Sequence, residues 1–430
     1  MMKMKINMRE WQSKCFPDLE LETKEQRELA RLLTDNDIVN IMELKDGLSI
    51  TANSFVGSVS LGSIHLNIMP KIQGTDLLTL MNYAYGLKDL TIIRQADFSL
   101  QSFTFADILI YQLYIHTEDL LSRGFHRGYI KKEEELASPK GRIDFNKIAR
   151  HHCMKKATLP SRYYERNVDN LLNRVLLAGL KLSVQLAADP NLILHLRRLC
   201  SDLGEFISPV ELTGQIIKRA QNNINRLTEP YRPLLKIIAI LKENQSIEFE
   251  DGDKKIRLTG FFFDMNRFFE ALAGRLLHDF APGYTVRGQY QLHHMFAYAR
   301  EHNPKNRRAP VPRPDFALLK NGQLARLMDA KYRDLWETPL PRDMLYQLSV
   351  YALSSKGGRQ ATIIYPTTNE YAVRQQIDIQ NPVTGEYMGS VLLEPLHLNF
   401  LAKCLKDIKN RRTELARYVH RFVSSAEMTS

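Results

Sequence analysis

RPDFALLKNGQLARLMDAKYRDL, residues 313–335, is the stretch that decides the fold of the carboxy-terminal part of this 430-residue chain. Two apolar runs flank the dipeptide Asn321-Gly322. Both residues tolerate the backbone conformation of a tight hairpin turn, so the pattern predicts two antiparallel strands joined there. Pro314-Asp315 precedes the first strand, and Asp329-Ala330-Lys331 closes the second. Charged residues therefore stand at the same end of both predicted strands.

The turn decides which of these charged side chains share a face. Side chains alternate between the two faces of a strand, so one extra residue in a hairpin reverses the relation between its strands. A regular two-residue turn puts Asp315 and Asp329 on opposite faces. A three-residue turn, with Gly322 left-handed in a bulge, puts both of them and Lys331 on one face and Asp315 opposite Leu327. We expect the bulged turn, because a metal site needs both carboxylates together.

Two carboxylates on one face suit Mg²⁺, a hard cation that takes one or two carboxylates and keeps several waters. We expect Asp315 and Asp329 to be its ligands, with the backbone carbonyl of Ala330 as a further ligand and Mn²⁺ as a substitute ion. Such an ion polarises a scissile phosphate and lowers the pKa of an attacking water. Lys331 projects to the same side, where its ammonium orients that water and offsets charge developing on the phosphate.

A third carboxylate is available in DMNRFFEALAGRLL, residues 264–277. Its apolar residues recur at helical spacing, and Glu270 lies on the flank of the stripe that they form. A helix docked on the sheet aims Glu270 towards the metal. The alternative is an exposed helical glutamate, which the spacing alone favours.

Three further residues are candidates for contact with nucleic acid. Gln347 and Tyr351 are four apart in PLPRDMLYQLSVYAL and share one face of a predicted helix, which contacts a DNA backbone or Lys331, or simply packs. Arg313 ends the basic segment HNPKNRRAPVPR just ahead of Asp315. It is either a phosphate contact or part of a solvated proline-rich loop.

The sequence patterns predict three structural regions along the chain. Residues 1–105 form a β-rich amino-terminal domain, with short strands over about 36–72 and a helix in DLLTLMNYAYGL. Residues 106–245 form a mostly helical middle region, with a helix that starts near Glu165 and ends before Asp189-Pro190. Within it, the partly cancelling charges of residues 122–145 predict a solvated surface loop.

Residues 246–430 alternate strand-like and helical patterns, which favours a sheet layered by helices. The expected elements are a strand in RLTGFFF, a helix from about Asn266, strands over 313–332, a helix from about Arg342 and a strand in QATIIYP. The expected class is therefore α/β, or α+β for the chain as a whole.

Composition narrows the function. The formal charge of +11 favours polyanionic partners such as DNA. No apolar run approaches the ~18 residues that span a bilayer, so we expect no membrane association. The four separated cysteines indicate reduced thiols in the cytoplasm. No phosphate-binding loop of the GxxxxGK[ST] type is present, so a nucleotide motor has to be another polypeptide.

The motif formed by Pro314-Asp315 and Asp329-Ala330-Lys331 resembles that of the PD-(D/E)XK nuclease superfamily. More narrowly, the chain resembles the McrC-like nuclease subunits of McrBC-type, modification-dependent restriction systems. The supporting segments occur in the order that this family shows: FVGSVSLGSIHLNIMPKI, KGRIDF, NVDNLLNRVLLAGL, FFFDMNRFFEALA, RPDF, MDAKYR and YQLSVYA.

The resemblance implies a restriction-endonuclease-like mixed sheet flanked by helices in residues 246–430. It implies that Asp315, Asp329 and Lys331 form the nuclease core, with Glu270 as an addition. It also implies a separate AAA+ GTPase partner that recognises modified DNA of the 5-methylcytosine type. The amino-terminal domain, residues 1–105, is then the partner-docking domain that stimulates this GTPase. Residues 122–145 are a candidate docking stretch.

Two other functions stay open at this point. The chain is a non-catalytic activator that assembles on an AAA+ ring, or it is a PD-(D/E)XK nuclease that acts in DNA repair without a GTPase partner. The first alternative predicts stimulation of the partner without cleavage. The second predicts cleavage that does not depend on a motor.

Overall fold

The computed structural model describes residues 4–17, 19–72, 74–86, 104–151, 158–245, 248–251, 254–257, 260–354, 359–407 and 411–423. They divide into two compact units. One takes the described residues within 1–95, 248–258 and 262–430, and the other takes those within 96–247 and 259–261. The helical region expected over 106–245 lies in the second unit, whereas most of the other two expected regions lies in the first.

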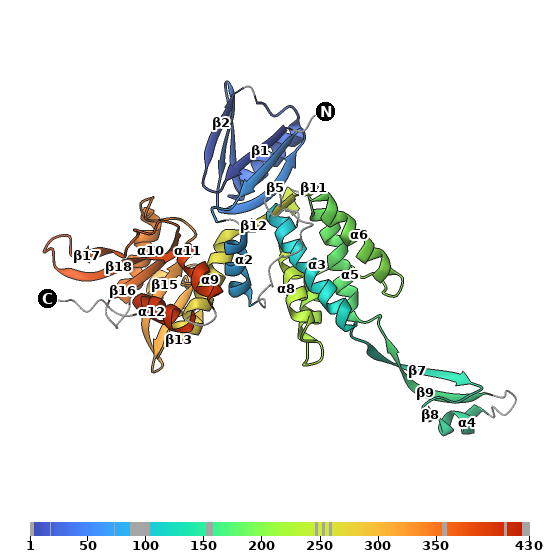
Figure 1. Ribbon diagram of the computed structural model, residues 1–430. Helices are drawn as coiled ribbons and strands as arrows, with labels where there is room; N and C mark the ends of the chain where they lie inside the picture. Colours follow the sequence, from blue (N-terminus) through green and yellow to red (C-terminus); the bar gives the residue numbers. More distant parts are fainter. Residues whose placement is uncertain are drawn as a thin grey trace. The chain divides into compact units, whose positions relative to one another are not determined.

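The amino-terminal part of the first unit contains two small sheets (Figure 1). One has the order β1-β6-β5-β12 and the other the order β2-β4-β3. The bounds are β1 Met4–Arg9, β2 Ser13–Pro17, α1 Lys24–Asp35, β3 Val39–Leu44, β4 Gly47–Ala52, β5 Phe55–Leu61, β6 Ile64–Met69 and α2 Gly74–Tyr85. The strands expected over 36–72 and the helix after them are confirmed.

Strand β12, Gly260–Asp264, corrects the expected organisation of the last region. The strand expected in RLTGFFF exists, but it belongs to the sheet of β1, β6 and β5 and not to the carboxy-terminal sheet. Helix α9, Met265–Phe280, begins at the next residue, where the Asp264 side chain caps it by accepting from the N–H of Asn266. A strand of the amino-terminal sheet thus leads directly into α9.

The second unit is built on helices, with an arm of strands extending from them (Figure 1). The helices are α3 Phe105–Arg123, α5 Leu171–Leu186, α6 Pro190–Gly204, α7 Gly214–Asn222 and α8 Tyr231–Asn244. The arm contains β7 Gly128–Leu136, β8 Arg142–Ile143, α4 Phe145–His151 and β9 Leu159–Asn167. A short two-stranded sheet of the first unit pairs β10 Glu248–Asp251 with β11 Lys254–Arg257.

The arm shows that two expectations for the middle region were wrong. Residues 122–145 are not a loop, because β7 pairs antiparallel with β9 along its whole length. Cross-strand ion pairs, such as Arg162 Nε to Glu133 Oε1 at 2.9 Å, stabilise charged faces that carry no apolar alternation. Glu165 lies in β9, and helix α5 begins only at Leu171, after Asn170 caps its first turn.

The carboxy-terminal part of the first unit is a six-stranded mixed sheet with the order β13-β14-β15-β16-β18-β17. Strands β15, β16 and β18 run parallel, and the other pairings are antiparallel. The bounds are β13 Thr285–Gly288, β14 Phe316–Lys320, β15 Gln323–Ala330, β16 Gln360–Thr367, β17 Gln375–Gln380 and β18 Tyr387–His397. The expected strands at 313–332 and in QATIIYP are confirmed.

Helix α9 and helix α10, Arg342–Ser354, cover opposite faces of this sheet. A Cβ on Gly274 of α9 would lie 2.9 Å from the ring of Phe316. Ala317, the next residue and therefore on the other face, belongs to a buried cluster with Leu348 and Tyr351 of α10. The remaining elements are η1 Arg300–His302, α11 Leu398–Lys406 and α12 Arg411–Val423.

Two further expectations concern the described residues as a whole. None of the helices within them is both long and apolar enough to cross a bilayer. Cys15, Cys200 and Cys404 are free thiols, and Cys153 lies outside the described residues.

Candidate active site

The hairpin between β14 and β15 forms as expected, but its irregularity lies elsewhere. Asn321 and Gly322 have φ angles of 51° and 77°, and the residues on either side of them pair, so the turn has two residues. The register shifts inside the ladder, where Leu318 pairs with Arg326 but Leu319 pairs with Leu324. The extra residue is therefore Ala325 in β15, and the expected three-residue turn was wrong.

The displaced bulge still brings the two aspartates to one face. Phe316 pairs with Met328, so the register continued by one residue places Asp315 opposite Asp329 and not opposite Leu327. The N–H of Asp315 donates to Oδ1 of Asp329 over 3.0 Å, and the N–H of Ala330 donates to Oδ2 of Asp315 over 2.9 Å. The backbone of each strand thus holds the carboxylate of the other.

Glu270 reaches this pair from α9 through a residue that the sequence did not single out. Gln289 follows β13, and its Nε2 donates to Oε1 of Glu270 over 2.7 Å and to Oδ1 of Asp315 over 3.2 Å. Its backbone has a φ of 48° and donates to the carbonyl of Asp315 over 2.8 Å. No motif predicts such a glutamine, because its role depends on a left-handed backbone and on partners from two distant segments.

Gln347 and Tyr351 approach the same carboxylates from α10. Nε2 of Gln347 donates to Oδ2 of Asp329 over 3.3 Å and to the hydroxyl of Tyr351 over 2.9 Å. Tyr351 is only 2% exposed, so it lies behind Gln347 and lacks the surface that direct contact with DNA requires. Arg313, by contrast, is exposed ahead of Asp315.

Burial and neighbouring negative charges disfavour the ionised form of the two aspartates at this end of the hairpin. Burial raises the pKa of Asp315 to about 7, and the negative charges of Asp329 and Glu270 add to the rise. Burial also raises the pKa of Asp329, again with a contribution from Glu270. A cation in contact with these groups relieves both effects, so the electrostatics favour binding of a proton or a metal ion.

Lys331 supplies one positive charge at the edge of this cluster. Its charge lowers the pKa of Asp329, although burial raises that pKa by more. Its backbone N–H donates to the carbonyl of Ile364 in the parallel strand β16 over 2.9 Å. No residue in the described ranges forms a hydrogen bond or ion pair with the ammonium itself. The half-buried lysine is therefore available to an external anion.

The donors fit a hard cation that keeps part of its hydration. Within the described residues, no three His, Cys, Asp or Glu side chains are gathered closely enough to hold a metal ion by themselves. Asp315 and Asp329 offer two carboxylates, and oxygens from the backbone, water or a phosphate have to complete the shell. This is the usual coordination of Mg²⁺ in enzymes that act on phosphates.

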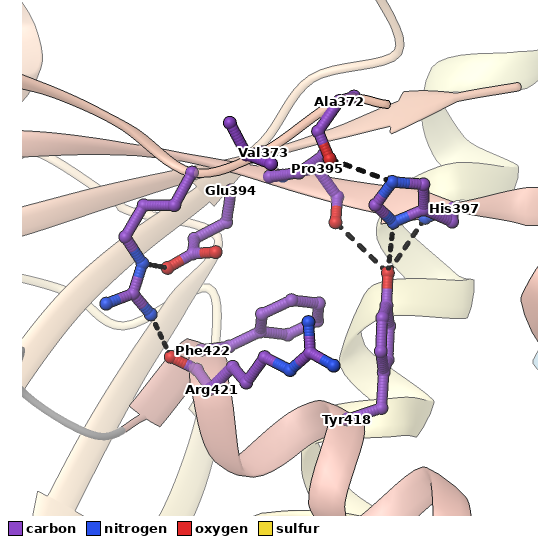
Figure 2. Close-up of a pocket in the computed structure, with 9 residues that line it drawn as sticks. Ala372, Val373, Glu394, Pro395, His397, Tyr418, Arg421 and Phe422 are labelled. Atoms are coloured by element: carbon purple, nitrogen blue, oxygen red, sulfur yellow. Dashed lines mark hydrogen bonds and ion pairs between the residues drawn. The ribbon is translucent and has the colours of Figure 1, made fainter. Parts of the chain in front are cut away.

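A separate cavity of about 260 Å³ lies between β18 and α12 in the same unit (Figure 2). Its polar groups bond to one another: Arg374 pairs with Glu394, and the hydroxyl of Tyr418 donates to the carbonyl of Pro395 over 3.1 Å. Nε2 of His397 bonds to the carbonyl of Ala372 over 3.0 Å. Burial raises the pKa of Glu394 to about 7. These contacts join β18 to its neighbours, and we assign the cavity no ligand.

Comparison with known proteins gives a family match over most of the chain. The model of the family described as "McrBC 5-methylcytosine restriction system component" matches residues 50–366. No curated protein matches the chain.

Among solved structures, a chain of the half-complex from the tetradecameric assembly of Thermococcus gammatolerans McrB AAA+ hexamers with bound McrC is similar in fold. It has 18% sequence identity and a TM-score of 0.65, and the match covers 97% of this chain and 100% of that chain. A chain of the Thermococcus gammatolerans McrBC complex has 19% identity and a TM-score of 0.48, with 65% of this chain and 89% of that chain covered.

Proposed function

The chain belongs to the family of McrBC 5-methylcytosine restriction system components, and we propose that it is the DNA-cutting subunit, a Mg²⁺-dependent endonuclease of the PD-(D/E)XK type. One observation carries the proposal. The carboxylates of Asp315 and Asp329 meet across the hairpin, with Glu270 joined to them by Gln289 and Lys331 beside them. These are the groups that metal-dependent hydrolysis of a phosphodiester needs.

Each residue has a role in this proposal. Asp315, Asp329 and the carbonyl of Ala330 would hold Mg²⁺ or Mn²⁺, and Glu270 would bind a water of its shell. The ion would polarise the scissile phosphate and acidify the attacking water. Lys331 would bind a phosphate oxygen and stabilise its developing negative charge. Gln347 holds Oδ2 of Asp329, so it orients that carboxylate.

DNA is the substrate that the charge distribution favours. The net charge of +11 provides a field that attracts a polyanion. The exposed cations Lys305, Arg307, Arg308 and Arg313 lie on the segment that leads to Asp315. We expect these residues to contact the phosphate backbone and to carry no sequence information. Recognition of a modified base of the 5-methylcytosine type would then belong to a partner.

A AAA+ GTPase is the partner that we propose, and the arm is our candidate for docking on it. The similar solved complex contains McrB AAA+ hexamers with bound McrC. The arm carries three exposed aromatic side chains, Tyr129, Phe145 and Tyr164. Aromatic residues are enriched at protein interfaces, where they supply large contact areas. We therefore propose that docking uses the stretch 122–145 and its partner strand β9 in place of residues 1–105.

The experiment that tests the proposal combines the protein with its partner GTPase, GTP, Mg²⁺ and plasmid with or without cytosine methylation. Asp329→Asn should abolish cutting and leave stimulation of GTP hydrolysis intact. Asp378→Asn, at an exposed position of the edge strand β17, is the matched control and should cut normally. Cutting by Asp329→Asn at the wild-type rate would refute the site.

Two other results would replace the proposal with an alternative. A wild-type protein that stimulates the GTPase and never cuts would be a non-catalytic activator. A protein that cuts equally well without any GTPase would be a nuclease of another pathway, such as DNA repair. For the arm, Tyr129→Ala with Tyr164→Ala should remove stimulation of the GTPase. Tyr371→Ala, which is even more exposed but lies in the other unit, should not.

A further inference from the structure

The amino-terminal sheet contacts the segment that follows the catalytic strand. Glu10 comes directly after β1, and its Oε1 accepts from the hydroxyl of Tyr332 over 2.7 Å. The same oxygen accepts from the N–H of Lys71 over 2.7 Å. Trp11, which follows Glu10, contacts Arg333, which follows Tyr332: the guanidinium lies 5.9 Å from the centre of the Trp11 ring. Two consecutive residues after Lys331 are therefore held by two consecutive residues of the amino-terminal part.

The same sheet holds the first turn of the helix that carries Glu270. Strand β12 runs into α9 without a loop, and the N–H of Met265 donates to the carbonyl of Ser54 over 3.0 Å. Nδ2 of Asn266 donates to Oγ of Ser54 over 2.6 Å. Glu270 follows four residues after Asn266, about one helical turn away. The amino-terminal sheet therefore contacts both segments that bring Lys331 and Glu270 to the site.

Tyr332 also joins these two segments directly. Its ring centre lies 5.9 Å from that of Phe269, the neighbour of Glu270, and the side chain is 3% exposed. A displacement of Tyr332 thus moves the backbone of Lys331 on one side and the packing of Glu270 on the other. Its hydroxyl is the group that sets its position against the amino-terminal sheet.

We propose that Glu10 and Tyr332 are positioning residues through which the amino-terminal sheet fixes Lys331 and Glu270 relative to each other. The inference rests on the proposed nuclease function. Because a catalytic group displaced by about 1 Å can cost roughly 100-fold in rate, the contact influences cleavage without touching the substrate. The amino-terminal sheet is then part of the nuclease machinery.

Burial of Glu10 is difficult to explain by stability alone. The residue is 2% exposed, and its Oε2 has no hydrogen-bond partner among the described residues. Burial raises its pKa to about 7, which shows that the surroundings disfavour the carboxylate. An apolar pair of the same volume avoids this cost. A carboxylate does provide a directional acceptor, which a packed methyl group cannot.

The test compares two tyrosines that donate to carboxylates and differ in what they position. Tyr332→Phe removes the hydroxyl and keeps the ring on Phe269. Tyr83→Phe is the matched control, because Tyr83 donates to Asp279 Oδ2 over 3.1 Å on the same helix α9, about two and a half turns beyond Glu270. For Tyr332→Phe we expect kcat for cleavage to fall about 10- to 100-fold. The KM of Tyr332→Phe for DNA should stay within about twofold of wild type, and so should the kcat of Tyr83→Phe.

Two variants at position 10 separate positioning from folding. Glu10→Gln keeps an oxygen that accepts from Tyr332, so it should retain wild-type kcat. Glu10→Leu removes the acceptor and should lose as much kcat as Tyr332→Phe, with no further loss in the double variant. Equal effects of Glu10→Gln and Glu10→Leu, or a loss in Tyr83→Phe as large as in Tyr332→Phe, would overturn the proposal.

Amide hydrogen exchange provides a readout that does not need cleavage. Tyr332→Phe should speed exchange in residues 265–271 and 329–333, and Tyr83→Phe should leave both segments unchanged. If the wild-type protein does not cut DNA, the proposed nuclease function fails while the exchange data still decide the positioning role. Unchanged exchange in Tyr332→Phe would refute that role even if the enzyme is active.

Discussion

The carboxylates of Asp315 and Asp329 each accept a hydrogen bond from the backbone of the other's strand. The N–H of Asp315 donates to Oδ1 of Asp329, and the N–H that follows Asp329 donates to Oδ2 of Asp315. One oxygen of each carboxylate therefore bonds within the hairpin, and the other accepts from a glutamine. Asp315 accepts from Gln289, and Asp329 accepts from Gln347. The geometry of the pair depends on strand register, so the bulge at Ala325 brings the two carboxylates to one face.

Lys331→Ala should reduce kcat for DNA cleavage about 100- to 1000-fold, because it removes a positive charge placed where negative charge develops on the phosphate. The KM for DNA should change little, since the proposed contacts of the basic segment ahead of Asp315 with the DNA backbone remain in this variant. Steady-state cleavage of a labelled duplex measures both constants. Lys320→Ala, at the turn end of β14, is the control and should be close to wild type. A rate for Lys331→Ala within about threefold of that control would contradict the role of Lys331.

Gln289→Ala should raise the Mg²⁺ concentration for half-maximal cleavage about 10- to 100-fold, the usual effect of losing a residue that orients metal ligands. The variant removes the single amide that donates to both Glu270 and Asp315, so the two carboxylates are no longer held together. A Mg²⁺ titration of the cleavage rate measures the change. Gln291→Ala, on an exposed position of the same loop, serves as the control. Identical Mg²⁺ curves for the two variants would refute this assignment.

Glu394→Gln should change how stability depends on pH. The pKa of Glu394 rises from 4.5 to about 7 in the folded protein because the residue is buried, although Arg374 opposes the rise. Between those pH values the native protein binds more protons than the unfolded chain, so its free energy of unfolding falls as pH increases. The variant lacks this fall, which amounts to at most about 3 kcal/mol.

Urea denaturation of the metal-free protein at several values between pH 4.5 and pH 8 measures that dependence. The free energy of unfolding of wild type relative to Glu394→Gln should decrease as pH rises. Glu386→Gln, at an exposed site before β18, should run parallel to wild type. A constant difference between wild type and Glu394→Gln would show that the carboxylate does not titrate in this range.

Gly179→Ala should destabilise the second unit by about 1–3 kcal/mol, the typical cost of an extra methyl group in a filled core. A Cβ on Gly179 in α5 would lie 2.5 Å from Cδ1 of Ile238 in α8, and Ile238 is fully buried. Gly204→Ala, at the end of α6, meets nothing within 4 Å and should be neutral or slightly stabilising. Thermal unfolding followed by circular dichroism compares them. A Tm for Gly179→Ala equal to that of Gly204→Ala would show that the helices separate to admit the methyl group.

Local patterns were sufficient where one segment determines its own structure. Asn321-Gly322 fixes the turn because both residues adopt positive φ, and the apolar spacing of residues 264–277 gives α9 its buried face. The strands of the arm were not predicted, because the local pattern that indicates a strand is absent from them. Its strands have no apolar alternation, since ion pairs between β7 and β9 replace a buried face.

The sequence by itself determined the hairpin, the order Pro-Asp and Asp-x-Lys at its open end, and the resemblance to a nuclease family. Only the tertiary structure decided that the extra residue is Ala325, that Gln289 links Glu270 to Asp315, and that Glu10 holds Tyr332. The physical reason is the separation along the sequence of the residues that interact. Turn and helix preferences depend on a few neighbouring residues, whereas strand register, a left-handed glutamine and a hydrogen bond across 322 residues of chain depend on the packing of distant segments.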